Sequence, residues 1–172
     1  LRTEVDTLRA SVAQARTEAR TDPLTGAANC AAFDDELARR CQLAAAGGDG
    51  FTLIMVDVDH FKRVNDEHGH AVGDRVLTGL VAFLRPRVRR DDLIARWGGE
   101  EFAVVLPGAS TRVALKKVRA ILRELAGTDW TIDGGRTIRF TVSAGVAAWK
   151  AGEDPERVTA RADRALYKAK HA

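Results

Sequence analysis

Residues 97–102 read Trp-Gly-Gly-Glu-Glu-Phe, and this stretch decides the interpretation of the chain. Two glycines at a turn let the backbone approach a ligand closely, because neither carries a Cβ atom. The carboxylates lead into an apolar run, residues 102–106, which predicts a strand after the turn. A second apolar run upstream ends with two acids at alternating positions, Asp57 and Asp59. Carboxylates at strand ends and turns are ligands for a divalent ion such as Mg2+, so we expect a metal-dependent enzyme that acts on nucleotide phosphates.

Length and composition indicate one compact domain with an additional helix. The 172 residues are too few for two ordinary domains, and a hydrophobic content of 45% supports a real core. The net charge of +3 is a mild bias and no signature of nucleic-acid binding. Cys30 and Cys41 lack metal-ligand spacing and suggest no disulfide framework, so a cytoplasmic location is expected. The chain begins with Leu1, which indicates a fragment whose full-length form could carry an upstream sensor domain and a membrane tether.

Residues 1–20 are expected to form a helical stalk that is separate from the domain at residues 21–172. Apolar residues recur there at spacings of four and three, a heptad pattern that runs from Leu1 to Ala19. The pattern is short and its later positions are alanines, so a lone amphipathic helix remains an alternative to a dimerising coiled coil.

The rest of the chain alternates between helix and strand patterns. Helices are expected over residues 29–46, 60–68, 72–84, 112–125 and 154–170, and strands over residues 51–57, 93–96, 101–106, 130–132 and 137–148. Glycine-rich turns at residues 98–99 and 133–136 predict two hairpins, and Asp22 is expected to cap the segment that follows it. This mixture predicts an α/β (α+β) fold, with a central mixed, largely antiparallel sheet of about five strands surrounded by helices.

Further polar and small residues stand near these strand ends and turns, and their order along the chain matters for the comparison that follows. They are Asp22, Thr25, Gly26 and Asn29; Asp57, Asp59, Phe61 and Lys62; Asn65, His70 and Asp74; Arg89 and Asp92; residues 141–146; and residues 162–170. Together with the turn at residues 97–102, this array resembles the GGDEF family of diguanylate cyclases, in the variant with Glu at the first acidic position (GGEEF). The resemblance covers residues 22–170.

The resemblance implies a palm-like nucleotidyl cyclase fold and the condensation of two GTP molecules into cyclic di-GMP and two pyrophosphates. Each domain would bind one GTP, so catalysis would require a homodimer. The cofactor would be Mg2+ or Mn2+, two ions per active site, held by Asp57, the Val58 carbonyl, Glu100 and Glu101. The three carboxylates would be the catalytic residues, and whether Glu100 or Glu101 acts as the base stays open.

Substrate-binding residues are implied in the same way. Gly98 and Gly99 would let backbone N–H groups meet phosphate oxygens. Lys62 and Lys170 stand where lysines of the family meet the triphosphate.

Guanine would be read by Asn65 and Asp74. An amide can bond to O6 or N3, and a carboxylate can accept from N1–H and N2–H, which favours GTP over ATP. His70 lies in the same loop, where a ligand contact and a structural role are both open.

Arg89 and Asp92 form an R-x-x-D pattern, which in the family marks an allosteric site for the product, cyclic di-GMP. A further arginine of that site is replaced here by Ala120, so we expect weaker product inhibition than is usual in the family. Cys30 stands where the family has an arginine paired with Asp22, so a looser turn is expected there.

Two other functions are kept as alternatives. The first is a catalytically silent domain that senses GTP or cyclic di-GMP, although the intact carboxylates argue against it. The second is a polymerase-like palm, but the sequence has no basic, aromatic-lined track for a strand, so no nucleic-acid partner is expected.

Overall fold

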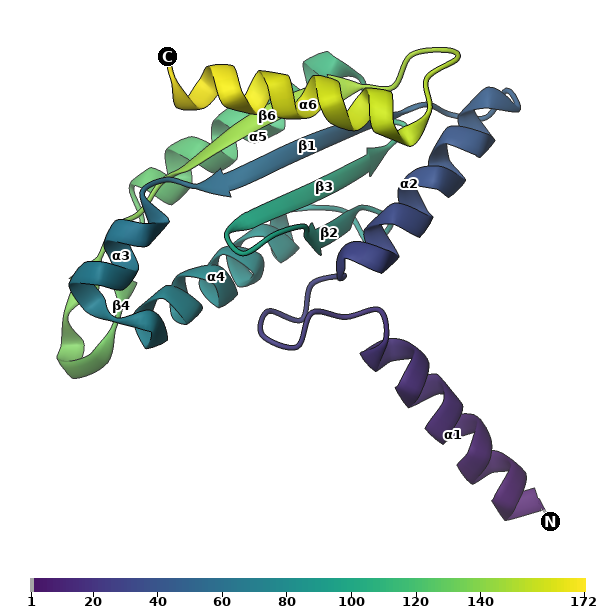
Figure 1. Cartoon of the computed structure of the whole chain (residues 1–172), viewed down its shortest axis with the longest axis horizontal. Helices are drawn as coiled ribbons and strands as arrows, with labels where there is room; N and C mark the ends of the chain where they lie inside the picture. The colour runs from purple at the N-terminus through teal and green to yellow at the C-terminus, as the bar shows by residue number, and fades with distance from the viewer. Residues whose placement is uncertain (1) are drawn as a thin grey trace.

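A four-stranded antiparallel sheet with the order β2-β3-β1-β6 forms the centre of the molecule (Figure 1). The computed structural model describes residues 2–172. β1 (Phe51–Val58) pairs with β3 (Glu101–Pro107) on one side and with β6 (Val142–Ala148) on the other. β2 (Leu93–Arg96) pairs with β3 at the edge of the sheet. β1 is therefore the central strand, with a hydrogen-bonded neighbour along each side.

Helices cover both faces of this sheet. α4 (His70–Leu84) and α5 (Thr111–Ala126) pack on one face, and α2 (Cys30–Ala45) and α6 (Pro155–Lys170) pack on the other. All eight residues of β1 are buried, as its nearly all-apolar sequence predicts. Alternate side chains of the strand enter the two cores, since successive residues of a strand point to opposite faces.

The α+β class is confirmed, and the sheet differs from the expected one in two respects. A mixed sheet was expected, but all pairs of strands are antiparallel. β3 runs opposite to both β1 and β2, and β6 runs opposite to β1. The strand expected over residues 137–148 is divided. β5 (Thr137–Ile138) pairs with β4 (Trp130–Thr131) in a separate ribbon, and only β6 joins the central sheet.

Short helices connect these elements. α3 (Phe61–His68) follows β1 and is separated from α4 by Gly69, whose φ of +88° is easy only for glycine. The 3-10 turn η1 (Arg85–Arg87) ends α4 at the predicted proline, and η2 (Asp133–Gly135) joins β4 to β5. The expected helices are therefore confirmed, with boundaries that differ by a few residues.

α1 (Arg2–Glu18) projects away from the domain (Figure 1). Its apolar residues Val5, Leu8 and Val12 are exposed to solvent. Leu1, the first position of the heptad pattern, lies outside the described residues. The helix is confirmed, while its pairing with a second copy stays a prediction.

Within residues 2–172, no helix combines the length and the apolar character needed to cross a membrane.

α6 packs directly against the backbone of β6 at Gly145. A Cβ atom built on Gly145 would lie 2.2 Å from the carbonyl oxygen of Ala162 and 2.2 Å from the amide nitrogen of Leu166. Both are backbone atoms, so any side chain at this position would push the helix off the sheet. The contact holds the C-terminal end of α6 beside the end of β1 (Figure 1).

We expect Gly145→Ala to lower the free energy of unfolding by at least about 1–3 kcal/mol, because the added methyl overpacks a backbone contact. Urea denaturation measures this change. Gly127→Ala is the matched control, since its Cβ would meet only ordinary contacts at 3.7 Å. A Gly145→Ala variant that unfolds at the same urea concentration as the parent would contradict this account of the packing.

Candidate active site

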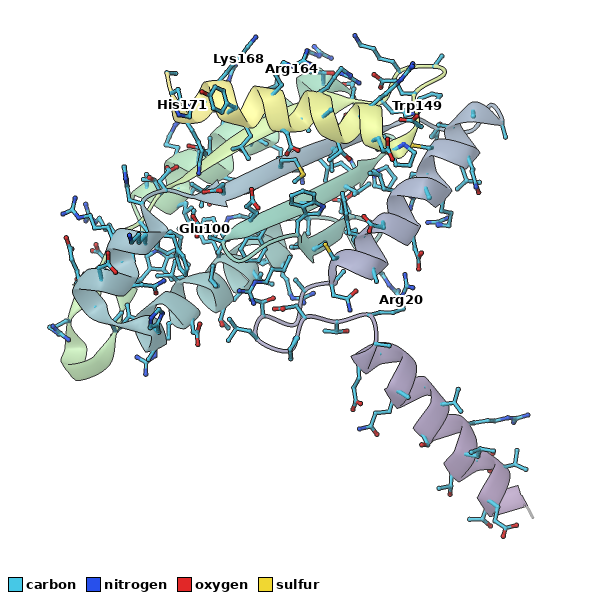
Figure 2. All side chains as sticks on the ribbon, in the orientation of Figure 1. Arg20, Glu100, Trp149, Arg164, Lys168 and His171 are labelled. Carbon is cyan, nitrogen blue, oxygen red and sulfur yellow. The ribbon has the colours of Figure 1, made fainter. Side chains whose placement is uncertain are left out.

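Carboxylates gather at one end of the central sheet, where β1 ends and β3 begins. Asp57 and Glu101 are direct partners in the register of the two strands, so their side chains share one face of the sheet. That face is the one covered by α6, because Leu53 and Met55 of the same strand pack in the core beneath it. Glu100 stands in the turn just before β3 (Figure 2).

A lysine from α6 reaches into this cluster. The Nζ atom of Lys170 forms an ion pair with Oδ1 of Asp57, which is only 6% exposed. Burial raises the pKa of Glu100, repulsion from Asp57 adds to the rise, and Lys170 opposes it. Burial likewise raises the pKa of Glu101, with further repulsion from Asp57, Asp163 and Glu100. The site therefore holds more negative charge than its one lysine neutralises.

These residues fit a divalent metal ion, although they do not enclose one. Among residues 2–172, no group of three or more His, Cys, Asp or Glu side chains is arranged to hold a metal by itself. The donors are nevertheless carboxylate oxygens whose mutual repulsion a cation relieves, and hard divalent ions prefer such oxygens. Phosphate and water oxygens would have to complete the coordination.

The glycine turn packs closely against Glu101. The N–H groups of Trp97 and Gly98 donate to the carbonyl of Glu101 at 2.8 and 3.1 Å. A Cβ on Gly98 would lie 2.5 Å from Oε2 of Glu101, whereas a Cβ on Gly99 would meet nothing within 4 Å. Gly98 thus makes room for the Glu101 carboxylate, and Gly99 leaves one side of the turn open.

Arg96 was missed by the sequence analysis, and it joins this turn to the linker after α1. Its guanidinium donates to the carbonyls of Gly98 and Gly99 and forms an ion pair with Asp22 at 3.2 Å. Burial of Asp22 works against ionisation, but hydrogen bonds from Thr25 and the Arg96 guanidinium hold the pKa of Asp22 below its ordinary value. The expected loss of a cationic partner for Asp22 is therefore wrong, because Arg96 forms an ion pair with it.

Asp22 caps the turn that follows it, as the sequence predicts. Its carboxylate accepts from the N–H and the hydroxyl of Thr25 at 2.9 and 2.6 Å, which closes the linker turn. Asn29 is the residue that caps α2, because its side chain accepts from the N–H of Ala32 at 2.9 Å.

The residues predicted to read guanine lie on the α3–α4 helical hairpin, at the same end of the sheet. Oδ1 of Asn65 is buried and accepts no hydrogen bond from the described residues. A Cβ on Gly73 would lie 1.9 Å from this oxygen, so Gly73, which had no predicted role, makes room for Asn65. Asp74 and His70 on α4, and Lys62 on α3, are exposed nearby.

Arg89 and Asp92 lie together in the turn before β2, away from the carboxylate cluster. The backbone N–H of Arg89 donates to the Asp92 carboxylate at 2.7 Å, and the Arg89 side chain is exposed. β2 runs from this turn to the glycine turn, so the two sites lie at opposite ends of one strand.

Comparisons with known proteins identify relatives along almost the whole chain. The model of the family "Diguanylate cyclase, GGDEF domain" matches residues 19–172. Diguanylate cyclase DgcP of Pseudomonas aeruginosa is 41% identical over 157 residues, which are 91% of this chain and 23% of the relative. Response regulator PleD of Caulobacter vibrioides is 38% identical over 152 residues, 87% of this chain and 34% of the relative. The chain thus spans about a quarter to a third of the length of these relatives.

Solved structures that resemble this chain come from the same family as these relatives. The coiled coil and GGDEF domain of DgcB from Caulobacter crescentus, in complex with c-di-GMP, has a TM-score of 0.93 and 37% identity, and the match covers 98% of this chain and 90% of that one. Diguanylate cyclase SiaD from Pseudomonas aeruginosa, in complex with its activator SiaC, has a TM-score of 0.87 and 31% identity, over 98% of this chain and 65% of that one. The palm-like fold expected from the sequence is confirmed.

We expect Glu101→Gln to be more stable than the parent at pH 7. A raised pKa means that the folded state binds protons more tightly than the unfolded state, so its stability falls as pH rises above the ordinary glutamate value. The amide removes that cost, and the difference between variant and parent should shrink toward pH 4, where the parent carboxyl becomes protonated. Urea denaturation at both pH values measures it.

Glu153→Gln is the control with the opposite sign. A hydrogen bond from Arg161 lowers the pKa of Glu153, so its amide should be less stable than the parent at pH 7. If Glu101→Gln also lost stability at pH 7, the carboxylate repulsion described above would be refuted.

Proposed function

Because the chain belongs to the GGDEF family of diguanylate cyclases, we propose that it condenses two GTP molecules into cyclic di-GMP and two pyrophosphates. One observation carries the proposal. Asp57 and Glu101 are paired across two strands, beside a glycine turn with one open side and next to Glu100. A domain that only sensed a nucleotide would gain nothing from this crowding of carboxylates, which raises their pKa values.

In this proposal each site holds two ions of Mg2+ or Mn2+. Their protein ligands would be Asp57, Glu100, Glu101 and the Val58 carbonyl. Diguanylate cyclases of the family are generally metal-dependent. When bound, the metal would neutralise phosphate charge and make the attacking 3′-hydroxyl more acidic. The raised pKa values of Glu100 and Glu101 suit a carboxylate that accepts the hydroxyl proton, and either residue meets that condition.

Lys170 would move between two partners. In this structure it balances the buried charge of Asp57. A metal ion at Asp57 would take over that task, and the lysine would then bind the triphosphate together with Lys62. The N–H of Gly98 already donates to the carbonyl of Glu101, so Gly98 would serve by making room in the turn, and the backbone N–H that follows at Gly99 would approach phosphate oxygens.

Asn65 and Asp74 would select guanine. The side-chain amide of Asn65 would donate to O6 or N3 of guanine, while its buried Oδ1 lies against Gly73 and fixes the orientation of the side chain. Asp74 is exposed on the neighbouring helix and would accept from N1–H and N2–H. His70, in the first turn of the same helix, would line the base pocket or support its loop.

A homodimer would complete the reaction, because each domain holds one GTP and each 3′-hydroxyl must reach the other α-phosphate. The exposed stripe of Val5, Leu8 and Val12 on α1 supports pairing of residues 1–20 as a stalk, with residues 21–172 as the cyclase domain. The DgcB structure likewise combines a coiled coil with a GGDEF domain. The greater length of the relatives supports an upstream sensor domain in the full protein, and GTP as substrate supports a cytoplasmic location.

Cyclic di-GMP would also act as an inhibitor, bound at Arg89 and Asp92. The exposed Arg89 guanidinium can stack on a guanine and bind a phosphate, and the matched DgcB structure contains c-di-GMP. With Ala120 on α5, this inhibition would be weaker than is usual in the family.

Asp57→Asn and Glu100→Gln should each reduce cyclic di-GMP formation from GTP and Mg2+ below detection, because each removes a charged metal ligand. Chromatography of the reaction products measures this. Glu156→Gln, on the exposed part of α6, is the matched control and should keep parental activity. A parent that binds GTP but forms no product would favour the silent sensor, and full activity in both variants would exclude the proposed mechanism.

Asp74→Ser should reduce discrimination between GTP and ATP by about 1–3 kcal/mol, since it removes the acceptor for two guanine donors. The ratio of kcat/KM for the two nucleotides measures it, with Asp66→Ser on α3 as an exposed control. An unchanged preference would mean that the base is read elsewhere.

A further inference from the structure

The guanidinium of Arg96 forms hydrogen bonds with both the glycine turn and the linker. Its Nε atom lies 3.2 Å from the carbonyl oxygens of both Gly98 and Gly99, and Nη2 lies 2.7 Å from that of Gly99. Its Nη1 atom donates to the two carboxylate oxygens of Asp22 at 3.2 and 3.4 Å. The group is planar and its N–H directions are fixed, so the contact on one edge orients the donors on the other edge.

These contacts determine which way the turn presents its N–H groups. In a trans peptide the C=O and the N–H point in opposite directions. When Arg96 holds the carbonyls of Gly98 and Gly99, the N–H groups of Gly99 and Glu100 therefore face away from it. Since the N–H of Gly98 already donates to the Glu101 carbonyl, the N–H groups of Gly99 and Glu100 are the ones that we assign to phosphate.

The linker is joined to the same strand as Arg96. The N–H of Ala28 donates to the carbonyl of Ile94 at 2.9 Å, and the N–H of Arg96 donates to the carbonyl of Ala28 at 2.8 Å. Asp22 and Ala27 close the linker loop with a 2.8 Å backbone hydrogen bond. Asp22 is thus held at a defined place beside the end of β2.

The end of α1 is fixed to this linker. The side chain of Asn29 donates to the carbonyl of Ala19 at 2.8 Å, and its backbone N–H donates to the carbonyl of Arg20 at 2.9 Å. Arg20, at the start of the linker (Figure 2), forms an ion pair with Asp35 of α2 at 2.7 Å. Hydrogen bonds therefore connect the last residues before the linker to Arg96 and the glycine turn.

We propose that Arg96 is a positioning residue that orients the Gly99 and Glu100 N–H groups for phosphate, and that Asp22 controls how firmly it does so. The linker thereby couples the placement of α1 to the geometry of the active-site turn. This proposal deepens the cyclase function and rests on it. A displacement of α1 that separates Asp22 from Arg96 frees one edge of the guanidinium and loosens the turn.

Amide hydrogen exchange in the nucleotide-free protein tests the coupling without relying on catalysis. Arg96→Lys keeps the charge but cannot bind two carbonyls and a carboxylate at once, so exchange should accelerate about tenfold at Trp97 and Gly98, whose N–H groups are hydrogen-bonded to the Glu101 carbonyl across the turn. Asp22→Asn touches neither amide, yet it should accelerate the same two. The double variant should add little to Arg96→Lys, because both changes act through one contact.

Arg40→Lys is the matched control. Arg40 is as buried as Arg96 and is ion-paired with Glu36 on α2, so its replacement should leave exchange at the turn unchanged. The coupling is overturned if Asp22→Asn leaves the exchange rates of the turn amides unchanged. It is also overturned if the effects of Asp22→Asn and Arg96→Lys on these rates simply add in the double variant. If Arg96→Lys does not fold, Asp22→Asn alone decides the question.

Steady-state kinetics with GTP tests the consequence for substrate. If the N–H groups bind phosphate, Asp22→Asn should raise KM for GTP about threefold with little change in kcat. An unchanged KM overturns the positioning role. If the parent makes no cyclic di-GMP while Asp22→Asn still accelerates exchange at the turn, the proposed function is refuted and the coupling stays in place.

Discussion

β1 is paired on both sides and covered on both faces, and the rest of the structure depends on this arrangement. Its eight buried residues contribute to both hydrophobic cores, so the strand cannot shift without disturbing four helices. It ends in a nearly buried carboxylate, Asp57, in a place where a charge is stable only with a partner. Lys170 is that partner in this structure, and the proposed metal would be the partner during catalysis.

The position of Lys170 depends in turn on the contact between α6 and Gly145. Backbone atoms of the helix lie so close to β6 that only a glycine fits between them. This contact brings Lys170 and Asp163 over the end of the sheet, one to neutralise the acidic cluster and the other to add to it. The raised pKa values of Glu100 and Glu101 indicate that the site lowers stability in order to concentrate charge, as is common where catalytic groups gather.

β2 joins the R-x-x-D residues to the glycine turn. Arg89 and Asp92, the proposed product site, precede the strand, and at its other end Arg96 contacts both the turn and Asp22. A product bound at the first site and a rotation of α1 at the second would therefore act on the same short strand. Such a strand is a simple physical route by which regulation could reach the carboxylates.

The sequence by itself determined the fold class, nearly every helix, and the residue types of the candidate site, because glycine turns, apolar periodicity and clustered acids are local patterns. It did not reveal that Arg96 pairs with Asp22, that Gly73 makes room for Asn65, or that residues 137–148 divide between two sheets. Only the tertiary structure decided these features. Each depends on contacts between residues far apart in the chain, and local spacing carries no information about which distant group fills a given space or neutralises a given charge.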